Sequence, residues 1–446
     1  MFLPLFRMKP KDFTAYAAYA RFDDGAWSAF AWSVPSRDSA GPSAGRRRSE
    51  SRAPLPAGFA TIWTTVALDL VGFGIVLPVL PLYAKRFHAS AGTAGALVAA
   101  FSLAQLVASP VWGRISDRIG RKPVLVVSLF GTAAGSLLTG LAGGLPLLFV
   151  GRLVDGASGA SVSVAQAAVA DLASPAQRAR LFGLLGAAFG LGFVLGPALG
   201  GALSPISPRL PFFVAAAIAG INGMIAIRRL PETRRPEAVA RPRGETTSVW
   251  RRRGMIELLA VAFLSLVAFS AFEGTFSLFG DRRLGLHQSS TYVVFTIIGV
   301  LIAVDQVVLV HPLVGRIGER AALRIGLVLN GLGLAMLPFV HSRWELAPAL
   351  LLLTAGQGLV TPTLASTVAG GVEARDRGRV LGVQQSVGGL ARVIGPAAGG
   401  LAFGHLGVWT PYAGGAGLVG LAVITLARSP RPVADGTSGP MMSPVG

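Results

Sequence analysis

Twelve long apolar stretches restrict what this chain can fold into more than any other feature. Each has a length near the roughly 20 residues that a helix needs to cross the apolar core of a bilayer. They lie at about residues 58–83, 90–112, 123–141, 145–169, 178–202, 210–227, 255–279, 290–313, 322–340, 346–370, 378–403 and 409–427. The sequence therefore predicts an all-α integral membrane protein with twelve transmembrane helices.

The charge distribution predicts how these helices lie in a membrane. The 446 residues are 52% hydrophobic and only 14% charged, which is too apolar for an ordinary soluble protein. The net charge of +19 alone would suggest nucleic acid, but the bases lie in the tails and in short alternate loops rather than with aromatics on a soluble domain. This asymmetry predicts cytoplasmic termini and no nucleic-acid partner. The expected location is a bacterial inner (plasma) membrane.

A polar break at residues 228–253, rich in Arg and Pro, divides the apolar stretches into six and six. The predicted segments are a disordered cytoplasmic tail (1–57), a six-helix bundle (58–227), a cytoplasmic linker (228–253), a second six-helix bundle (254–427) and a cytoplasmic tail (428–446). An alternative for residues 1–57 is that the natural start of the protein lies further in.

The two halves repeat each other. Gly196-Pro197 matches Gly395-Pro396 at an offset near 199 residues. Residues 113–118 are echoed by residues 315–320 at an offset near 202, with Glu319 in place of the acid. Two matches at nearly one offset indicate two pseudo-symmetric six-helix bundles, an organisation common among secondary transporters.

Residues 113–123 form a compact charged run between two apolar stretches, and predict a tight hairpin on one membrane face. Gly113 and Gly120 would let the backbone turn where a Cβ would obstruct it. One acid, Asp117, lies among the bases Arg114, Arg118, Arg121 and Lys122. The alternative interpretation of this run is a simple positive-inside anchor.

Among the charged residues of the apolar stretches there are six clear cases inside a span, and a charge at the bilayer centre costs roughly 2.5 to 3.5 kcal/mol on insertion scales. They are Asp69, Arg152, Asp155, Glu273, Asp305 and Arg392. Such residues should pair or face a wet cavity, although Glu273 and Asp305 have the alternative of reaching a nearby membrane surface. Asp69 stands alone near the middle of its stretch, with Thr65 one turn before it on the same face. A lone acid that must be neutral in lipid and charged in water is a natural proton carrier, so Asp69 is a candidate for that role.

Polar residues follow helical spacing in two further stretches. In the fourth they are Arg152, Asp155, Gly159, Ser163 and Gln166, and in the eleventh Gln385, Gly389 and Arg392. Each set predicts one polar face that lines water, substrate or another helix. Arg152 and Asp155 are close enough to interact.

In the fifth stretch, three glycines four residues apart lie on one helix face, namely Gly192, Gly196 and Gly200. This spacing lets a neighbouring backbone approach closely. Pro197 removes a helical hydrogen bond and should bend the helix. A close helix crossing and a functional hinge are both compatible with this pattern.

Several functions are excluded by what the sequence lacks. It contains no phosphate-binding loop of the Gly-x-x-x-x-Gly-Lys-Ser/Thr type, so ATP is not the expected energy source. It has no soluble segment large enough for catalysis, and therefore is not expected to be an enzyme. The five histidines are scattered near span ends and there is no cysteine, so no metal site and no cofactor are expected.

These residues resemble the major facilitator superfamily, and within it the tetracycline-resistance and multidrug proton antiporter branch. Residues 113–122 are similar to its Gly-x-Leu-x-Asp-Arg-x-Gly-Arg-Arg signature, with Ile115 for Leu and Lys122 for the last Arg. Residues 68–81, 152–159 and 192–201 resemble the signatures of helices one, four and five, the last found chiefly in exporters.

The resemblance implies roles for individual residues. Asp117 would cap a helix end of the opposite half in the outward-open state, and Arg121 would pair with Asp171, forming a latch together with Gly113, Arg118 and Gly120. Gly196-Pro197 would pack between the halves and limit leak. The tetracycline carriers have an acid in helix three where this chain has Gly135, and a small neutral residue where it has Asp155. This departure favours Asp69 and Asp155 as carriers of the exchanged proton.

The sequence thus predicts a monomeric, proton-coupled exporter of a small, amphipathic or drug-like organic molecule, working by alternating access. The proton gradient supplies the energy, and the partners are the substrate, protons and the lipid bilayer. The proton-coupling candidates are Asp69, Arg152, Asp155 and Glu273. The predicted substrate cavity is lined by Phe73, Gln166, Phe269, Phe276, Gln385 and Arg392. Alternatives are an importer or uniporter of the same fold, and a non-transporting membrane receptor.

Overall fold

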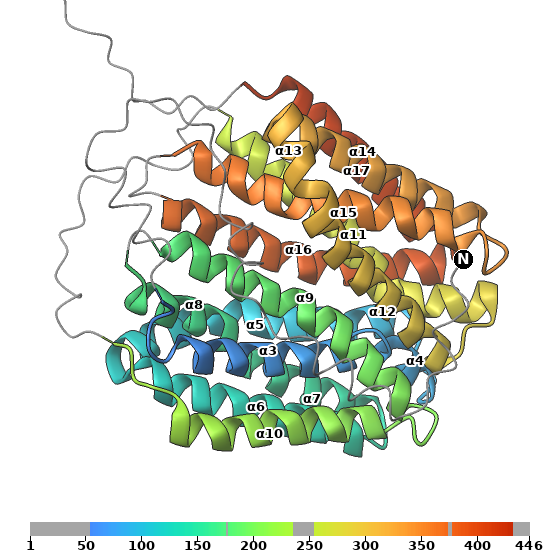
Figure 1. The fold of residues 1–446 in the computed structure, drawn as a ribbon. Coiled ribbons are helices and arrows are strands. Elements are labelled where there is room, and N and C mark those ends of the chain that lie inside the picture. Colours follow the sequence, from blue (N-terminus) through green and yellow to red (C-terminus); the bar gives the residue numbers. More distant parts are fainter. Residues whose placement is uncertain (1–53, 175–176, 235–253, 373–376, 431–446) are drawn as a thin grey trace, which may run out of the picture. The chain divides into compact units, whose positions relative to one another are not determined.

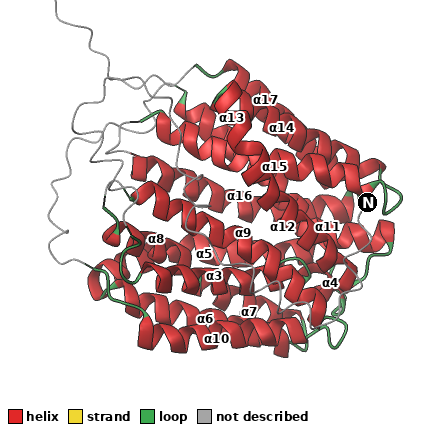
Figure 2. Cartoon of the chain, in the orientation of Figure 1, coloured by secondary structure: helices red, strands yellow, loops and turns green. Residues whose placement is uncertain are grey.

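A computed structural model describes residues 54–174, 177–234, 254–372 and 377–430. Within these ranges the regular structure is entirely helical (Figure 2). Twelve helices or helix pairs are long and apolar enough to cross a membrane, as the sequence predicts. Most of the two predicted tails and most of the predicted linker lie outside the described residues.

The helices form two sets that follow one another along the chain (Figure 1). The N-terminal half contains α3 (Phe59–Val76), α4 (Leu80–Lys85), α5 (Ala91–Ile119), α6 (Arg121–Leu141), α7 (Leu145–Ser158), α8 (Ser161–Leu172), α9 (Arg178–Leu203) and α10 (Leu210–Arg229). The C-terminal half contains α11 (Met255–Leu284), α12 (Gln288–Asp305), the π-helix η5 (Gln306–Val310), α13 (His311–Ile317), α14 (Glu319–Met336), the 3-10 helix η6 (Leu337–Phe339), α15 (Leu346–Gly370), α16 (Arg377–His405) and α17 (Thr410–Arg428).

Two predicted spans are split by residues that are not helical, and the eighth changes to a π-helix at Gln306–Val310. The first is split into α3 and α4 around Pro78, which has no N–H to continue the helical ladder. The fourth is split into α7 and α8 at Gly159 and Ala160, a break that the helical spacing of the polar residues did not predict. The start of α3, the turn between α5 and α6 and the end of α10 lie together on one side of the helices. This side is here called the hairpin side. The opposite side, where α4 lies, is called the α4 side.

The predicted hairpin differs from the observed turn. Helix α5 continues through the charged residues to Ile119, so Gly113 lies inside a helix rather than at a turn. Only Gly120, with φ of 110°, leaves the helical conformation, and α6 begins at the next residue. Charged side chains beyond the apolar stretch do not end a helix by themselves, whereas a glycine with positive φ does.

The same turn shows the register of the repeat. Gly318 ends α13 and precedes α14 with φ of 80° and ψ of 161°, and Gly120 has φ of 110° and ψ of 161°. These two turns are therefore equivalent, with an offset of 198 residues that agrees with the 199 of Gly196 and Gly395. Glu319 consequently corresponds to Arg121, and the predicted match of Glu319 with Asp117 was out of register because it aligned the wrong glycines.

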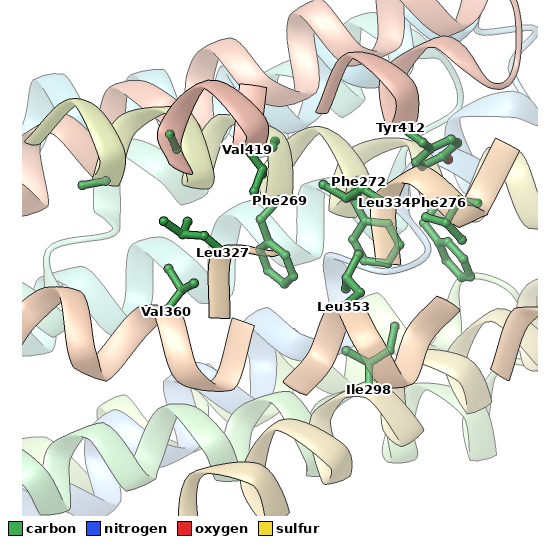
Figure 3. Packing of buried hydrophobic residues seen from close by; sticks show 14 of the residues in the cluster. Phe269, Phe272, Phe276, Ile298, Leu327, Leu334, Leu353, Val360, Tyr412 and Val419 are labelled. Atoms are coloured by element: carbon green, nitrogen blue, oxygen red, sulfur yellow. The ribbon is translucent and has the colours of Figure 1, made fainter. Parts of the chain in front are cut away.

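Each half has its own apolar core. In the C-terminal half, aromatic residues of α11 pack on α17 and on neighbouring helices (Figure 3). Phe272 and Phe276 lie 5.1 Å apart between ring centroids, and Tyr412 lies 6.5 Å from Phe272. Such packing holds the six spans of a half together, and leaves the contacts between the halves to a small number of helices, chiefly α5 with α16 and α9 with α12.

Candidate functional site

The break between α7 and α8 builds a polar cluster with the middle of α3. Ser161, at the start of α8, donates its hydroxyl hydrogen to Oδ2 of Asp69 at 2.5 Å. The other carboxylate oxygen of Asp69 is buried and has no hydrogen-bond partner within the described part of the chain. Gln105 of α5 donates to the carbonyl of Gly159 at 3.0 Å, and thus supplies a partner for the backbone at the break. The acid therefore has one satisfied oxygen and one free to bind a proton.

An ion pair lies beside Asp69. Arg152 Nη1 is 2.7 Å from Asp155 Oδ2, and the two residues are only 2% and 6% exposed. The guanidinium carbon of Arg152 also lies 4.4 Å from the ring centroid of Phe101, in a cation–π contact. Asp155 is close enough to Asp69 to repel its charge. Since Arg152 and Asp155 offset one another, Asp69 provides the net charge of this cluster.

Gly135 makes room for Asp155. A Cβ on Gly135 would lie 2.5 Å from the Cβ of Asp155 and 2.6 Å from its backbone nitrogen. A side chain in helix three at this point would therefore collide with α7. The absence of an acid at position 135 and the presence of one at position 155 are thus two parts of one packing arrangement.

The other predicted cavity residues are spread over both halves. Phe73 of α3 is half-buried and its ring lies 5.5 Å from that of Phe101. Gln166 is half-buried on α8, and Gln385 is exposed on α16. Ser163, predicted to share the polar face of Arg152, lies beyond the helix break and donates to the carbonyl of Ala160 at 3.0 Å.

In the C-terminal half, Glu273 of α11 and Arg392 of α16 attract one another electrostatically without forming a direct ion pair. Phe269 is 8% exposed at the edge of the C-terminal core. Phe276 is fully enclosed there and packs on Phe272 and Phe295, so the structure places it in the core rather than in a cavity. Residue type alone did not distinguish these two positions.

The contact of Arg121 with Asp171, predicted as part of a latch, is present on the hairpin side of the N-terminal half. Arg121 contacts Asp171 at 3.0 Å and Asp117 at 2.6 Å, and it donates to the Ser116 hydroxyl at 2.7 Å. The Asp117 side chain is 64% exposed. Its partner here is Arg121 of its own half, and the cap on the opposite half stays a prediction.

Sequence reasoning missed Glu232, which follows α10. Its carboxylate accepts hydrogen bonds from the backbone N–H groups of Arg121 and Lys122, at 2.9 and 3.1 Å, and so caps the start of α6. Partial burial opposes ionisation of Glu232, but the N–H groups of residues 234, 121, 122 and 233 together lower its pKa. Arg234 donates to the carbonyl of Arg118 at 2.7 Å. The first residues of the linker are thus held against the Gly120 turn by hydrogen bonds.

The glycines of α9 face two different neighbours. A Cβ on Gly192 would lie 2.7 Å from the Cβ of Leu70, and one on Gly196 would lie 2.6 Å from the Cα of Gly74, both on α3 of the same half. Gly200 instead faces Tyr292 of α12. Gly196, the residue before Pro197, is therefore packed inside its own half, and Gly200 makes the contact between the halves.

Comparison with known proteins identifies the family. A sequence model of the Major Facilitator Superfamily matches residues 62–309 and 306–442. The chain belongs to the Major Facilitator Superfamily. Among the described residues, no group of three or more His, Asp or Glu side chains is arranged to hold a metal ion.

Its relatives include drug-resistance transporters. The class G tetracycline resistance protein of Vibrio anguillarum is 34% identical over 340 residues, which are 74% of this chain and 86% of that protein. Multidrug resistance protein 2 of Bacillus subtilis is 30% identical over 384 residues, 82% of this chain and 94% of that protein. The human organic anion transporter MFSD10 is 27% identical, with a TM-score of 0.64 over 83% of this chain and 98% of its own. The protein is thus an integral membrane transporter of the tetracycline and multidrug branch, and not an enzyme.

Proposed function

We propose that the protein is a proton-coupled antiporter that exports a small organic, drug-like molecule by alternating access. The observation that carries this proposal is the Asp69 carboxyl, half-buried near the middle of α3. One of its oxygens accepts a hydrogen bond from Ser161, and the other is buried and has no hydrogen-bond partner among the described residues. The names of its relatives, which are tetracycline and multidrug resistance proteins, support the substrate class.

The cluster around Asp69 suits the binding of one proton. Because Arg152 and Asp155 neutralise each other, protonation of Asp69 removes the net charge of the cluster. A neutral cluster costs less free energy inside the apolar core than a charged one. The proton would enter from the α4 side, bind Asp69 and leave on the hairpin side, which the basic residues assign to the cytoplasm.

Substrate and proton would share the space between the halves. Phe73 offers an apolar ring close to Asp69 on α3, and Gln166, Gln385 and Arg392 offer polar groups from α8 and α16. Glu273 is a second proton candidate, because it lies inside a span of the opposite half and Arg392 acts on it electrostatically. Binding of substrate at one stage and of a proton at another would give the exchange.

The test uses everted membrane vesicles in which respiration builds a proton gradient that a quenched dye reports. Tetracyclines, fluoroquinolones, macrolides and cationic dyes are added one at a time. We expect one class to collapse the gradient in native vesicles and in the control Glu345→Gln, which removes an acid outside the membrane spans, but not in Asp69→Asn. Coupling that persists in Asp69→Asn would show that another group carries the proton. Silence across the panel, with protein confirmed in the membrane, would favour a metabolite importer or uniporter of the same fold.

A further inference from the structure

Tyr292 is a residue of the C-terminal half that is buried inside the N-terminal half. It lies near the start of α12 and is 0% exposed. Its hydroxyl donates to the carbonyl oxygen of Ile75, in the last turn of α3, at 2.9 Å. Its ring covers α9, where a Cβ on Gly200 would lie 2.5 Å from the Tyr292 Cζ. One side chain thus joins α12 to α3 and α9.

The carbonyl of Ile75 needs such a donor. In a continuing helix it would accept from the N–H of Val79, but α3 ends at Val76 and α4 begins only at Leu80. The last carbonyls of a helix have no partner within the helix and must find one elsewhere. A buried carbonyl without a donor is costly, so Tyr292 stabilises the end of α3 only while α12 is in place.

Further contacts join the halves at the same level. Lys85 of α4 forms an ion pair with Asp281 of α11. Ser204 donates to the Ser289 hydroxyl at 3.2 Å, and Gln288 donates to the carbonyl of Pro208 at 3.4 Å. Beside the ion pair lies an open pocket of about 400 Å³, lined by residues of both halves. These contacts lie at the α4 ends of the helices, whereas Asp117 on the hairpin side is largely exposed.

We propose that Tyr292 is the residue that holds the α4 side shut in this conformation. This inference rests on the proposed alternating access. When the halves separate on the α4 side, the hydroxyl leaves Ile75, and water reaching the opened interface supplies the carbonyl with a new donor. The ion pair between Lys85 and Asp281 is partly exposed and adds a smaller, salt-dependent contribution. Gly200 is required because only a residue without a side chain leaves room for the ring.

The test measures how often the two halves separate on the α4 side. Because the chain contains no cysteine, a single introduced cysteine is the only thiol that a maleimide can label. Ala94 of α5 is 1% exposed and packs with the core of the opposite half, so Ala94→Cys reports separation on the α4 side. The purified protein in lipid nanodiscs is treated with a polar maleimide. We expect Tyr292→Phe, which removes only the hydroxyl, to increase the labelling rate about three- to tenfold, the effect of one lost hydrogen bond.

Tyr412→Phe is the matched control. Tyr412 is also 0% exposed, but its hydroxyl lies 3.2 Å from Thr275 within the C-terminal half, so its removal should leave the labelling rate unchanged. Equal rates in Tyr292→Phe and in the native protein would overturn the proposal, as would an equal increase in Tyr412→Phe.

A second pair of variants covers the case that Tyr292→Phe folds poorly. Gly200→Ala should displace the ring and speed labelling, whereas Gly190→Ala on the same helix meets nothing within 4 Å and should not. Neither measurement needs a substrate or a proton gradient. Faster labelling of these variants without any drug-driven proton flux would therefore support the role of Tyr292 and overturn only the proposed export function. Drug-driven proton flux with an unchanged labelling rate would support the export function and overturn the role of Tyr292.

Discussion

The turn at Gly120 and the turn at Gly318 have the same backbone but different chemistry. Both join the second and third spans of a half, and both are tied to the end of that half's sixth span. At Gly120 the tie is an acid, Glu232, which accepts from the backbone N–H groups of Arg121 and Lys122. At Gly318 the tie is a base, because Arg320 donates to the carbonyls of Leu426 and Ser429 at the end of α17.

The two turns also differ in the partners of the charged residue that follows the glycine. Arg121 is shared by Asp171 and by Asp117, and the Asp117 side chain is 64% exposed and so is able to exchange partners. At the equivalent position Glu319 accepts a hydrogen bond from Ser366 of α15 in its own half. The comparison teaches that the two copies share the geometry of the turn, while the residue that follows the glycine is an arginine between two acids in the N-terminal copy and an acid in the C-terminal copy. We therefore expect the N-terminal turn to act in transport and the C-terminal turn to act mainly in stability.

The largest expected effect comes from Arg121→Gln. It removes charged hydrogen bonds worth roughly 1.5 to 3 kcal/mol each and leaves two acids without their partner. We expect the initial rate of compound-dependent proton flux, per inserted molecule, to fall about tenfold or more, since 1.4 kcal/mol corresponds to a factor of ten. Arg320→Gln is the matched change at the other turn, and should lower the thermal midpoint while preserving most of the flux per folded molecule. Equal losses of flux would show that the two turns have the same role.

A smaller effect is expected from alanine at the two glycines. Both have positive φ, so each alanine introduces strain of roughly 1 to 3 kcal/mol. At Gly120 the new Cβ would also lie 2.8 Å from the Glu232 Cδ and displace the cap of α6, whereas at Gly318 it would meet nothing within 4 Å. Thermal unfolding of both variants in detergent should therefore show the larger loss for Gly120→Ala. Equal losses would mean that Glu232 contributes little to the turn.

Most of the fold could be predicted because it depends on local composition. Twelve apolar stretches of sufficient length give the spans, and the basic loops and the repeat divide them into two halves. The interruptions were harder, because a helix break at Gly159 depends on what receives its freed backbone groups, here Gln105 from another helix. The register of the repeat was also missed, because two similar short motifs offered the wrong pair of glycines.

The candidate site could be predicted only in part, because its contacts join distant residues. The pair of Arg152 and Asp155 lies three residues apart on one helix and was expected. Ser161 bonds to Asp69 across 92 residues, and Tyr292 reaches Ile75 across 217. A single sequence gives no spacing rule for such pairs. A serine directly after the Gly159 break was the one available signal for the partner of Asp69.

The smallest expected effect is a difference in pH dependence between the two turns. Bonds from four backbone N–H groups lower the pKa of Glu232 despite its partial burial, so the stability that it contributes is fully present above the ordinary carboxyl pKa of 4.5. That contribution is lost as the pH falls through the lowered pKa, because the protonated acid accepts these bonds less well. The thermal midpoint of Glu232→Gln should lie below that of the native protein at neutral pH, and the two should converge in acid. The bonds that Arg320 donates to the carbonyls of Leu426 and Ser429 involve no carboxylate, so the deficit that Arg320→Gln causes by removing them should persist in acid. If the deficit of Glu232→Gln did not change with pH, the negative charge of Glu232 would not contribute to stability. The difference between an acid at the Gly120 turn and a base at the Gly318 turn would then have no effect on the free energy of unfolding.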